Sequence, residues 1–198
     1  IKKFTKNNKI IMIISISGAA GSGKTTIAKM LAKKLGWPRY YIGGIRRKKA
    51  LEINMTLEEY NKLGETDPST DAEVDEYQKE LGRKEDNFII EGRTSWYFIP
   101  HSFKIYFDVD EKIAAKRIYN DLAKGAQRNE AKELHTYEDV LKSLAERREN
   151  DIRRYKKYYN INAYDKKNYD CVIDTSNLSI NEVFEKTHGI VRTIIDKK

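Results

Sequence analysis

Short apolar segments alternate with amphipathic helical patterns along the chain. Five apolar segments, rich in β-branched and aromatic residues, have the length of buried strands. They span Ile11–Ser17, Tyr40–Ile42, Phe88–Glu91, Lys104–Asp108 and Cys171–Asp174. Because helical patterns separate these segments, the chain is predicted to form a three-layer α/β fold. Helices would cover both faces of a five-stranded parallel sheet joined by right-handed crossovers.

Each predicted strand ends at a polar or glycine-containing cluster. The clusters are Ser17-Gly18, Gly43-Gly44, Glu91-Gly92-Arg93, Asp108-Val109-Asp110 and Asp174-Thr175-Ser176. In parallel sheets of this kind, ligands bind beyond the carboxyl ends of the strands. We therefore expect the five strand ends to line a single cleft.

The stretch between the second and third strands has no strand pattern. Thr56 and Glu59 are spaced as a capping box, and Asp67-Pro68 opens a second helix that is predicted to run to Gly82. This insertion, over about 44–85, is longer than an ordinary crossover. It is typical of a subdomain that closes over a substrate.

Helical patterns continue after the fourth strand. One covers 114–121 and breaks near 124–130, and a long helix then opens at Thr136-Tyr137-Glu138-Asp139. A closing helix is expected near 180–195. With 198 residues, no internal repeat and no low-complexity linker, the chain is predicted to be one domain over 1–198.

One segment between the first strand and the following helix has specific chemistry. It reads Gly18-Ala19-Ala20-Gly21-Ser22-Gly23-Lys24-Thr25, with the helical pattern starting at Thr26. In this strand–loop–helix order, successive backbone N–H groups and the helix dipole hold a polyphosphate. Lys24 would reach the terminal phosphates and Thr25 would ligate Mg²⁺. The loop predicts nucleoside triphosphate binding but does not identify what receives the phosphate.

Arginines supply candidate groups for a second anion. They follow the strand ends or lie on the later helices, at Arg46, Arg47, Arg93, Arg117, Arg128, Arg147, Arg148 and Arg154. Phosphoryl transfer needs cations for the acceptor phosphate, and the guanidinium fork suits it better than an ammonium group. On the long helix, Arg147, Asp151 and Arg154 share a face, so the carboxylate can orient both guanidiniums. One such arginine alone would be read as a solvated surface charge, but several around one phosphate loop favour an acceptor site.

The amino-acid composition narrows the possible classes of function and partner. The net charge of +8 suits a phosphorylated substrate or nucleic acid, but the lysine-rich bias is spread along the chain, which favours a proteome-wide bias. The single cysteine excludes an internal disulfide and a cysteine-based zinc cluster, and the three histidines lack metal-ligand spacing. No apolar run approaches the length of a membrane span, and residues 1–11 lack the apolar core of a signal peptide. A cytoplasmic enzyme is expected.

Together these motifs resemble a known family. The phosphate loop, the insertion after Tyr41–Arg47 and the Glu91-Gly92-Arg93 cluster are similar to nucleoside monophosphate (NMP) kinases of the P-loop class. The segment Glu146–Tyr155 resembles the arginine–aspartate helix of cytidylate kinases, especially the compact archaeal type. The segments Thr56–Tyr60 and Asp67–Gln78 also resemble the insertion of that group. The resemblance covers about Met12 to Ile195; the phosphate loop is highly specific for the superfamily, and the later motifs are moderately specific for the branch.

The resemblance implies a P-loop kinase fold with its core over 10–43 and 86–198, an NMP-binding insertion over about 44–85 and a short lid over about 121–135. ATP and Mg²⁺ would be the cofactors. The implied catalytic residues are Lys24, Arg128, Arg147, Asp151 and Arg154. The implied substrate-binding residues are Arg46, Arg47, Asp75, Gln78, Gly92, Arg93, Arg147 and Arg154. Residues 18–26 and Thr175 would bind ATP, and Thr25 and Glu91 would bind the metal, Glu91 by orienting its water.

Some positions depart from the pattern. Gly44 and Glu91 stand where many relatives have aspartate, and Thr94-Ser95-Trp96 stands where an acidic residue often follows the arginine. The preferred base and sugar are therefore left open. Asp71 and Asp75 share a helical face; we interpret Asp71 as a helix N-terminal charge. For Asp75 two interpretations stay open: a helix N-terminal charge, or an acceptor for the amino group of cytosine.

The resulting prediction is a monomeric enzyme that transfers the γ-phosphate of ATP to a nucleoside monophosphate, CMP or dCMP, with no membrane or nucleic-acid partner. Two alternatives remain. One is a P-loop kinase for another acceptor, such as AMP, UMP or a small metabolite. The other is a nucleotide-dependent RNA-binding protein that uses the basic segment Arg147–Lys157.

Overall fold

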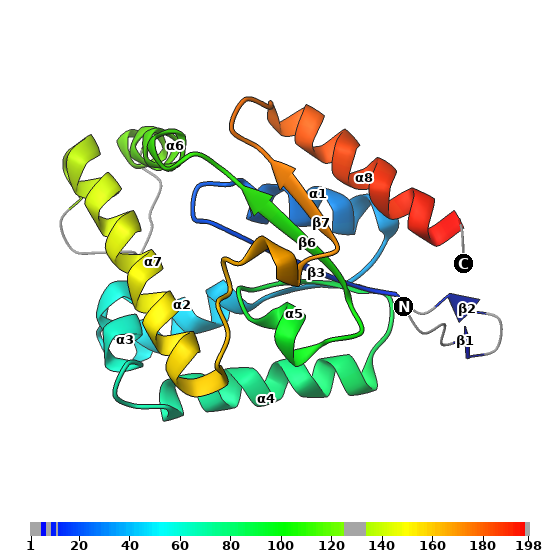
Figure 1. Cartoon of the computed structure of the whole chain (residues 1–198), viewed down its shortest axis with the longest axis horizontal. Coiled ribbons are helices and arrows are strands. Elements are labelled where there is room, and N and C mark those ends of the chain that lie inside the picture. The colour runs from blue at the N-terminus through cyan, green and yellow to red at the C-terminus, as the bar shows by residue number, and fades with distance from the viewer. Residues whose placement is uncertain (1–4, 7–8, 11, 125–133, 197–198) are drawn as a thin grey trace.

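The computed structural model describes residues 5–6, 9–10, 12–124 and 134–196. At its centre lies a five-stranded parallel sheet with the strand order β4-β5-β3-β6-β7 (Figure 1). The strands are β3 (Ile13–Gly18), β4 (Arg39–Tyr41), β5 (Phe88–Glu91), β6 (Phe103–Asp108) and β7 (Cys171–Asp174). The five-stranded parallel α/β sheet is therefore confirmed, with small shifts at the strand ends.

Helices cover both faces of this sheet (Figure 1). Successive strand residues point to opposite faces, so neighbouring residues of β3 enter different clusters. Ile14 and Ile16 pack with α1 (Lys24–Leu35) and α8 (Ile180–Asp196), whereas Ile13 packs towards helices from the β4–β5 connection. The core is thus helix, sheet and helix, as predicted.

The β4–β5 connection folds as three helices: α2 (Ile42–Glu52), α3 (Leu57–Leu63) and α4 (Ser69–Lys84). Thr56 forms the expected capping box with Glu59 at the start of α3. The Asp67 carboxylate accepts from the Ser69 N–H at 2.9 Å, next to the start of α4. Helix α4 continues beyond Gly82, where it was predicted to stop.

Helix α2 was not predicted, because Gly43-Gly44 was assigned to the cluster at which the second strand ends. The two glycines instead lie in the first turn of α2. Glycine has a low helix propensity, which hides such a helix from pattern analysis. The reason for glycine is local packing: a Cβ on Gly44 would lie 2.6 Å from the Tyr41 ring. The glycines let α2 start directly against the side chain that ends β4.

The remaining elements include a separate two-stranded antiparallel sheet. Its strands are β1 (Thr5–Lys6) and β2 (Lys9–Ile10), and the other elements are α5 (Ser95–Phe98), α6 (Glu111–Ala123), α7 (Tyr137–Tyr159) and the 3₁₀ turn η1 (Lys166–Asn168). Helix α7 opens at the predicted Thr136 cap, which Asp139 completes. The proposed lid over 121–135 lies mostly outside the described residues. Within the described ranges, no helix is both long and apolar enough to span a bilayer.

Gly18 ends β3 with a φ of 146°, and a Cβ there would overlap the Phe107 carbonyl oxygen on β6. We expect Gly18→Ala to lower the free energy of unfolding by about 1–3 kcal/mol, the usual effect of forcing atoms into a packed site. The matched control is Gly189→Ala on α8, where a Cβ meets nothing within 4 Å; it should stabilise by about 0.5–1 kcal/mol. Urea denaturation measures the free energy of unfolding of both variants. Equal changes in the two variants would contradict the packing role of Gly18.

Candidate active site

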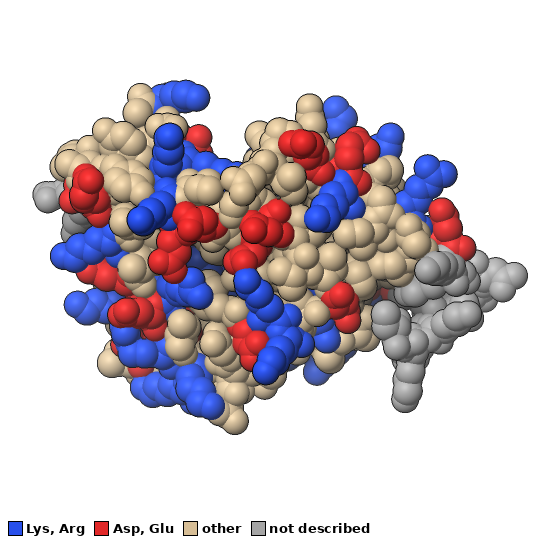
Figure 2. Space-filling model, turned by 45° about the horizontal axis from the view of Figure 1, so that its top comes forward, with Lys and Arg blue, Asp and Glu red and all other residues tan. Residues whose placement is uncertain are grey.

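A cavity of about 720 Å³ opens beyond the carboxyl ends of β3, β4 and β5. Its walls come from the phosphate loop, the first turns of α1 and α2, the inner face of α4, the residues after β5, and parts of α6, α7 and the loop after β7. In Figure 2 the surface is notched between the lobe that carries α6 and α7 and the lobe that carries α8. The strand-end cleft is therefore present, except that the clusters Ser17-Gly18 and Asp108-Val109-Asp110 do not line it. The end of β6 is not among the lining residues, because Asp108 pairs with Lys166 and Asp110 caps α6.

The phosphate loop connects β3 to α1. Gly23 has a left-handed φ of 80° and no side chain caps α1, so the first-turn N–H groups are left for a ligand. The Lys24 Nζ donates to the Ala19 carbonyl at 3.1 Å, so this side chain lies across the loop. Residues 20–26 line the cavity. Gly18 and Ala19, predicted as contact residues, are not among the lining residues and instead shape the loop.

Thr25 and Glu91 meet at the base of the cavity. The Thr25 hydroxyl donates to one Glu91 oxygen, and Arg39 donates to the other at 2.7 Å. Glu91 is 1% exposed. Arg39 balances its negative charge, and the contacts with Arg39 and Thr25 fix the position of its carboxylate. The Thr25 oxygen keeps lone pairs for a cation, and Mg²⁺ commonly takes only one or two protein oxygens beside substrate phosphates and water. The donor set therefore fits Mg²⁺, with Glu91 acting through Thr25. Arg39 lies at the start of a strand, where the sequence carried no signal for this role.

Arg117 joins the donor-side loops, a role that the sequence did not reveal. From α6 it donates to the carbonyl oxygens of Gly21 at 3.3 Å, Thr175 at 2.6 Å and Ser176 at 3.2 Å. The Thr175 hydroxyl donates to the Asp108 carbonyl at 2.9 Å. Both Arg117 and Thr175 line the cavity. Arg117 thus ties the phosphate loop to the loop after β7 on the side where Thr175 was predicted to border the ATP base.

Four arginines line the opposite wall: Arg46, Arg47, Arg93 and Arg147. The Arg47 guanidinium donates to the Tyr41 hydroxyl and to the Gly43 carbonyl, the latter at 3.1 Å. Gly92 also lines the cavity, and a Cβ there would overlap the Ser95 hydroxyl. The structure therefore brings together four of the arginines predicted for the acceptor anion. Arg117 contacts the phosphate loop instead, and Arg148 pairs with Glu111 and does not line the cavity. Arg128 lies outside the described residues.

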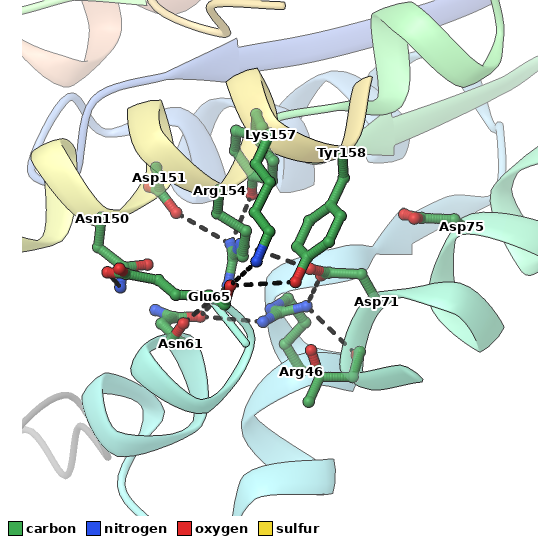
Figure 3. Close-up of polar contacts among 12 residues, drawn as sticks. Arg46, Asn61, Glu65, Asp71, Asp75, Asn150, Asp151, Arg154, Lys157 and Tyr158 are labelled. Atoms are coloured by element: carbon green, nitrogen blue, oxygen red, sulfur yellow. Dashed lines mark hydrogen bonds and ion pairs between the residues drawn. The ribbon is translucent and has the colours of Figure 1, made fainter. Parts of the chain in front are cut away.

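A series of ion pairs connects Arg46 and Arg93, two arginines of this wall, through residues that include the buried Asp151 and Arg154. Arg46 pairs with Asp71, and the other Asp71 oxygen lies 3.4 Å from the Arg154 Nε. Arg154 pairs with Asp151 at 3.1 Å, and Asp151 pairs with Arg93 at 3.0 Å. Figure 3 shows Arg154 from α7 lying between Asp151 and the insertion helices. The five residues form a chain of alternating charge, which we call the arginine–aspartate chain.

This chain shows how deep three of the residues singled out in the sequence lie. Asp151 is 0% exposed and Arg154 is 1% exposed, and neither lines the cavity. They therefore lie one layer behind the residues that face it. Burial raises the pKa of Asp151, but Arg93, Arg154 and Arg147 outweigh it and hold that pKa below its ordinary value. Asp71 lies in the first turn of α4, as predicted, but it is also buried between two guanidiniums and lines the cavity.

Helix α7 also contacts Glu65, in the segment between α3 and α4 (Figure 3). Arg153 contacts the Glu65 carboxylate at 2.8 Å, and Asn150 donates to the same group. Lys157 and Tyr158 donate to the Glu65 carbonyl at 2.7 and 3.1 Å. The contact with Arg153 lowers the pKa of the Glu65 carboxyl. The basic segment of α7 is thus largely occupied by contacts within the protein.

Asp75 and Gln78 lie three residues apart on α4 and both line the cavity. Burial raises the pKa of Asp75, whose carboxylate accepts from the Tyr159 hydroxyl. Gln78 is 0% exposed, and its Oε1 accepts from the Ser95 hydroxyl at 2.7 Å. The Gln78 Nε2 has no hydrogen-bond partner among the described residues. The wall therefore offers a carboxylate acceptor beside an amide donor, each held from behind.

The sheet, the phosphate loop and the cavity define a P-loop kinase. Solved structures agree on the fold: a shikimate kinase from Bacteroides thetaiotaomicron superposes with a TM-score of 0.61 at 14% identity, over 94% of this chain and 99% of that one. A gluconokinase from Sinorhizobium meliloti superposes with a TM-score of 0.59 at 8% identity, over 94% of each chain. At such low identity the likeness shows the fold alone.

Sequence comparison places the chain more narrowly. The model of the cytidylate kinase-like family matches residues 13–177, and the chain belongs to that family. It is 41% identical to the cytidylate kinase of Methanocella arvoryzae, over 83% of this chain and 88% of the relative. It is 37% identical to the cytidylate kinase of Pyrococcus furiosus, over 93% of this chain and 88% of the relative. It is 36% identical to the cytidylate kinase of Methanocaldococcus jannaschii, over 93% of this chain and 98% of the relative.

Proposed function

We propose that this protein transfers the γ-phosphoryl group of ATP to CMP or dCMP, giving ADP and CDP or dCDP. The observation that carries the proposal is the arrangement of one cavity. A phosphate loop forms one wall, and four arginines with the Asp75–Gln78 pair form the other. The names of the relatives, cytidylate kinases, support the same acceptor.

The described side chains suit a direct transfer between two bound anions. The phosphate-loop N–H groups and Lys24 would hold the ATP phosphates, and the arginine wall would hold the acceptor phosphate. An oxygen of that phosphate attacks the γ-phosphorus, and the bond from this phosphorus to the β–γ bridging oxygen breaks as ADP leaves. The acceptor is already an oxyanion near neutral pH, so no strong general base is required. Thr25 would hold Mg²⁺, which neutralises charge on the transferred group.

The insertion α2–α4 would form the acceptor site, with the Asp75–Gln78 pair reading the base. Cytosine presents an amino donor next to ring and carbonyl acceptors. The Asp75 carboxylate can accept from the amino group, and the Gln78 amide can donate to an acceptor. Uracil presents a carbonyl oxygen in place of the amino group, which would face the carboxylate. The pair therefore favours cytosine.

Asp75→Asn tests this base contact. We expect kcat/KM for CMP to fall about 10- to 100-fold, the effect of losing one hydrogen bond to a charged group. Activity with UMP should fall less, so that the CMP-to-UMP preference narrows. Glu76→Gln, an exposed neighbour on α4, is the matched control and should change neither. An unchanged CMP-to-UMP ratio in Asp75→Asn would exclude Asp75 from base recognition.

The overall activity is tested by measuring ADP release with a panel of acceptors: CMP, dCMP, UMP, AMP, GMP and shikimate. CMP or dCMP should give the highest kcat/KM. A tenfold higher kcat/KM for AMP or UMP, about 1.4 kcal/mol in transition-state stabilisation, would show that the acceptor is that nucleotide and not CMP. If no monophosphate stimulates ADP release, the proposal is wrong, and tight, salt-sensitive RNA binding would then favour the RNA-binding alternative.

A further inference from the structure

Asn61 on α3 connects two arginines that come from different helices. Its side-chain oxygen accepts from the Arg46 Nη2 at 3.1 Å and from the Arg154 Nη1 at 3.2 Å (Figure 3). Asn61 is 4% exposed. One neutral amide oxygen therefore holds two guanidiniums together away from water.

Asp71 contacts the same two guanidiniums. Two buried cations thus share two acceptors, of which only Asp71 carries a charge. Burial and repulsion from the neighbouring Arg154 lower the pKa of Arg46 to about 10. An aspartate at position 61 would have nearly the same shape as asparagine and would relieve this repulsion. The chain has the amide instead.

The consequence of a neutral residue at 61 appears along the whole arginine–aspartate chain. Among its own five members, three arginines and two aspartates, the chain has one more positive than negative charge. The arginines at its two ends, Arg46 and Arg93, line the cavity, while its central Arg154 is buried behind. A surplus charge in a water-poor wall attracts an anion in the cavity strongly. A second carboxylate beside Arg46 would cancel it.

We propose that Asn61 is a positioning residue for the acceptor. Its amide aligns Arg46 with Arg154 without neutralising them, and so reserves the positive charge of the arginine–aspartate chain for the phosphate of the incoming monophosphate. This inference rests on the proposed function, because it assigns the arginine wall to the acceptor and not to ATP.

Asn61→Asp separates this role from simple packing. A purely structural Asn61 would tolerate aspartate, which keeps the acceptor oxygen and adds an attractive charge. The proposed role predicts instead that Tm stays equal or rises, while KM for CMP rises about tenfold or more. KM for ATP and kcat at saturating CMP should stay within about twofold of the unaltered protein. Lys62→Met is the matched control: it makes the same net charge change at an exposed neighbouring residue of α3 and should leave KM for CMP unchanged.

Asn61→Ala provides a second variant if the aspartate protein does not fold. It keeps the surplus charge but removes the shared acceptor, so Tm should fall and KM for CMP should rise about three- to tenfold. A lower Tm with an unchanged KM for CMP would overturn the inference, as would an unchanged KM for CMP in a folded Asn61→Asp protein. Either result leaves the proposed function standing if the unaltered protein phosphorylates CMP. Absence of CMP-dependent turnover in the unaltered protein overturns the proposed function, and the inference with it.

Discussion

Replacing Lys24 with alanine is expected to reduce phosphoryl transfer by about 10²–10³-fold, the loss typical of removing one preorganised group that stabilises transition-state charge. Lys24 begins α1 at the cavity wall, and its ammonium group lies across the phosphate loop against the Ala19 carbonyl. On ATP binding this cation would follow the charge of the transferred phosphoryl group. No other lysine is among the described residues that line the cavity, so none can replace it there.

The loss should appear in kcat measured at saturating ATP and CMP, with Tm nearly unchanged. Lys33→Ala is the matched control, because Lys33 lies on the exposed face of the same helix. It should leave turnover within about twofold. If both variants retain full turnover, Lys24 does not stabilise the transferred group. If Lys24→Ala also unfolds the protein, its effect on turnover is structural.

Replacing Asp151 with asparagine is expected to lower the free energy of unfolding by about 3–5 kcal/mol, the usual penalty for leaving buried charge without its partner. The substitution keeps the shape of the side chain but removes the negative charge between Arg93 and Arg154. Turnover should fall as well, because Arg93 at the cavity wall loses the group that orients it. Urea denaturation and initial rates measure the two effects.

Glu149→Gln is the control for Asp151→Asn. It removes a carboxylate on the exposed face of the same helix, and this carboxylate pairs with Arg153 in contact with solvent. The substitution should lower the free energy of unfolding by less than about 1 kcal/mol. The pKa of Asp151 is lowered in the fold, so its contribution is fully present above the unfolded value of about 3.9 and is lost as the pH falls through the folded value. The stability gap between the unaltered protein and Asp151→Asn should therefore narrow in acid. A gap that is constant down to pH 2 would contradict the ionic explanation.

Much of the fold was predictable because local signals agreed with it. The β-branched runs of β3 and β5 are short and continuous, as fully buried parallel strands require. Thr56 and Thr136 carried capping-box partners at the correct spacing, and both caps form. Helix α2 was missed because its first turn contains two glycines, which are required by packing against Tyr41 and not by a turn.

The candidate site was predictable where its residues follow strand ends, as Thr25, Glu91 and Arg93 show, or share one helix. The spacing of Asp151 and Arg154 on one helix indicated their pairing, and the structure shows it. Their burial depends on side chains from distant segments: Arg93 after β5 and the Asp71 and Asn61 groups of the insertion. No local pattern indicates that Asp71 is a buried bridge, because an acidic residue in the first turn of a helix is common for other reasons.

The most direct test of the central claim is to identify the products formed from ATP, CMP and Mg²⁺. After incubation with the protein, anion-exchange chromatography separates CMP, CDP, ADP and ATP, and a phosphate assay measures inorganic phosphate. We predict that CDP and ADP appear in equal amounts, that neither forms without CMP, and that Lys24→Ala forms both far more slowly. ADP accompanied by inorganic phosphate and no CDP, at a rate independent of CMP, would contradict the proposed function.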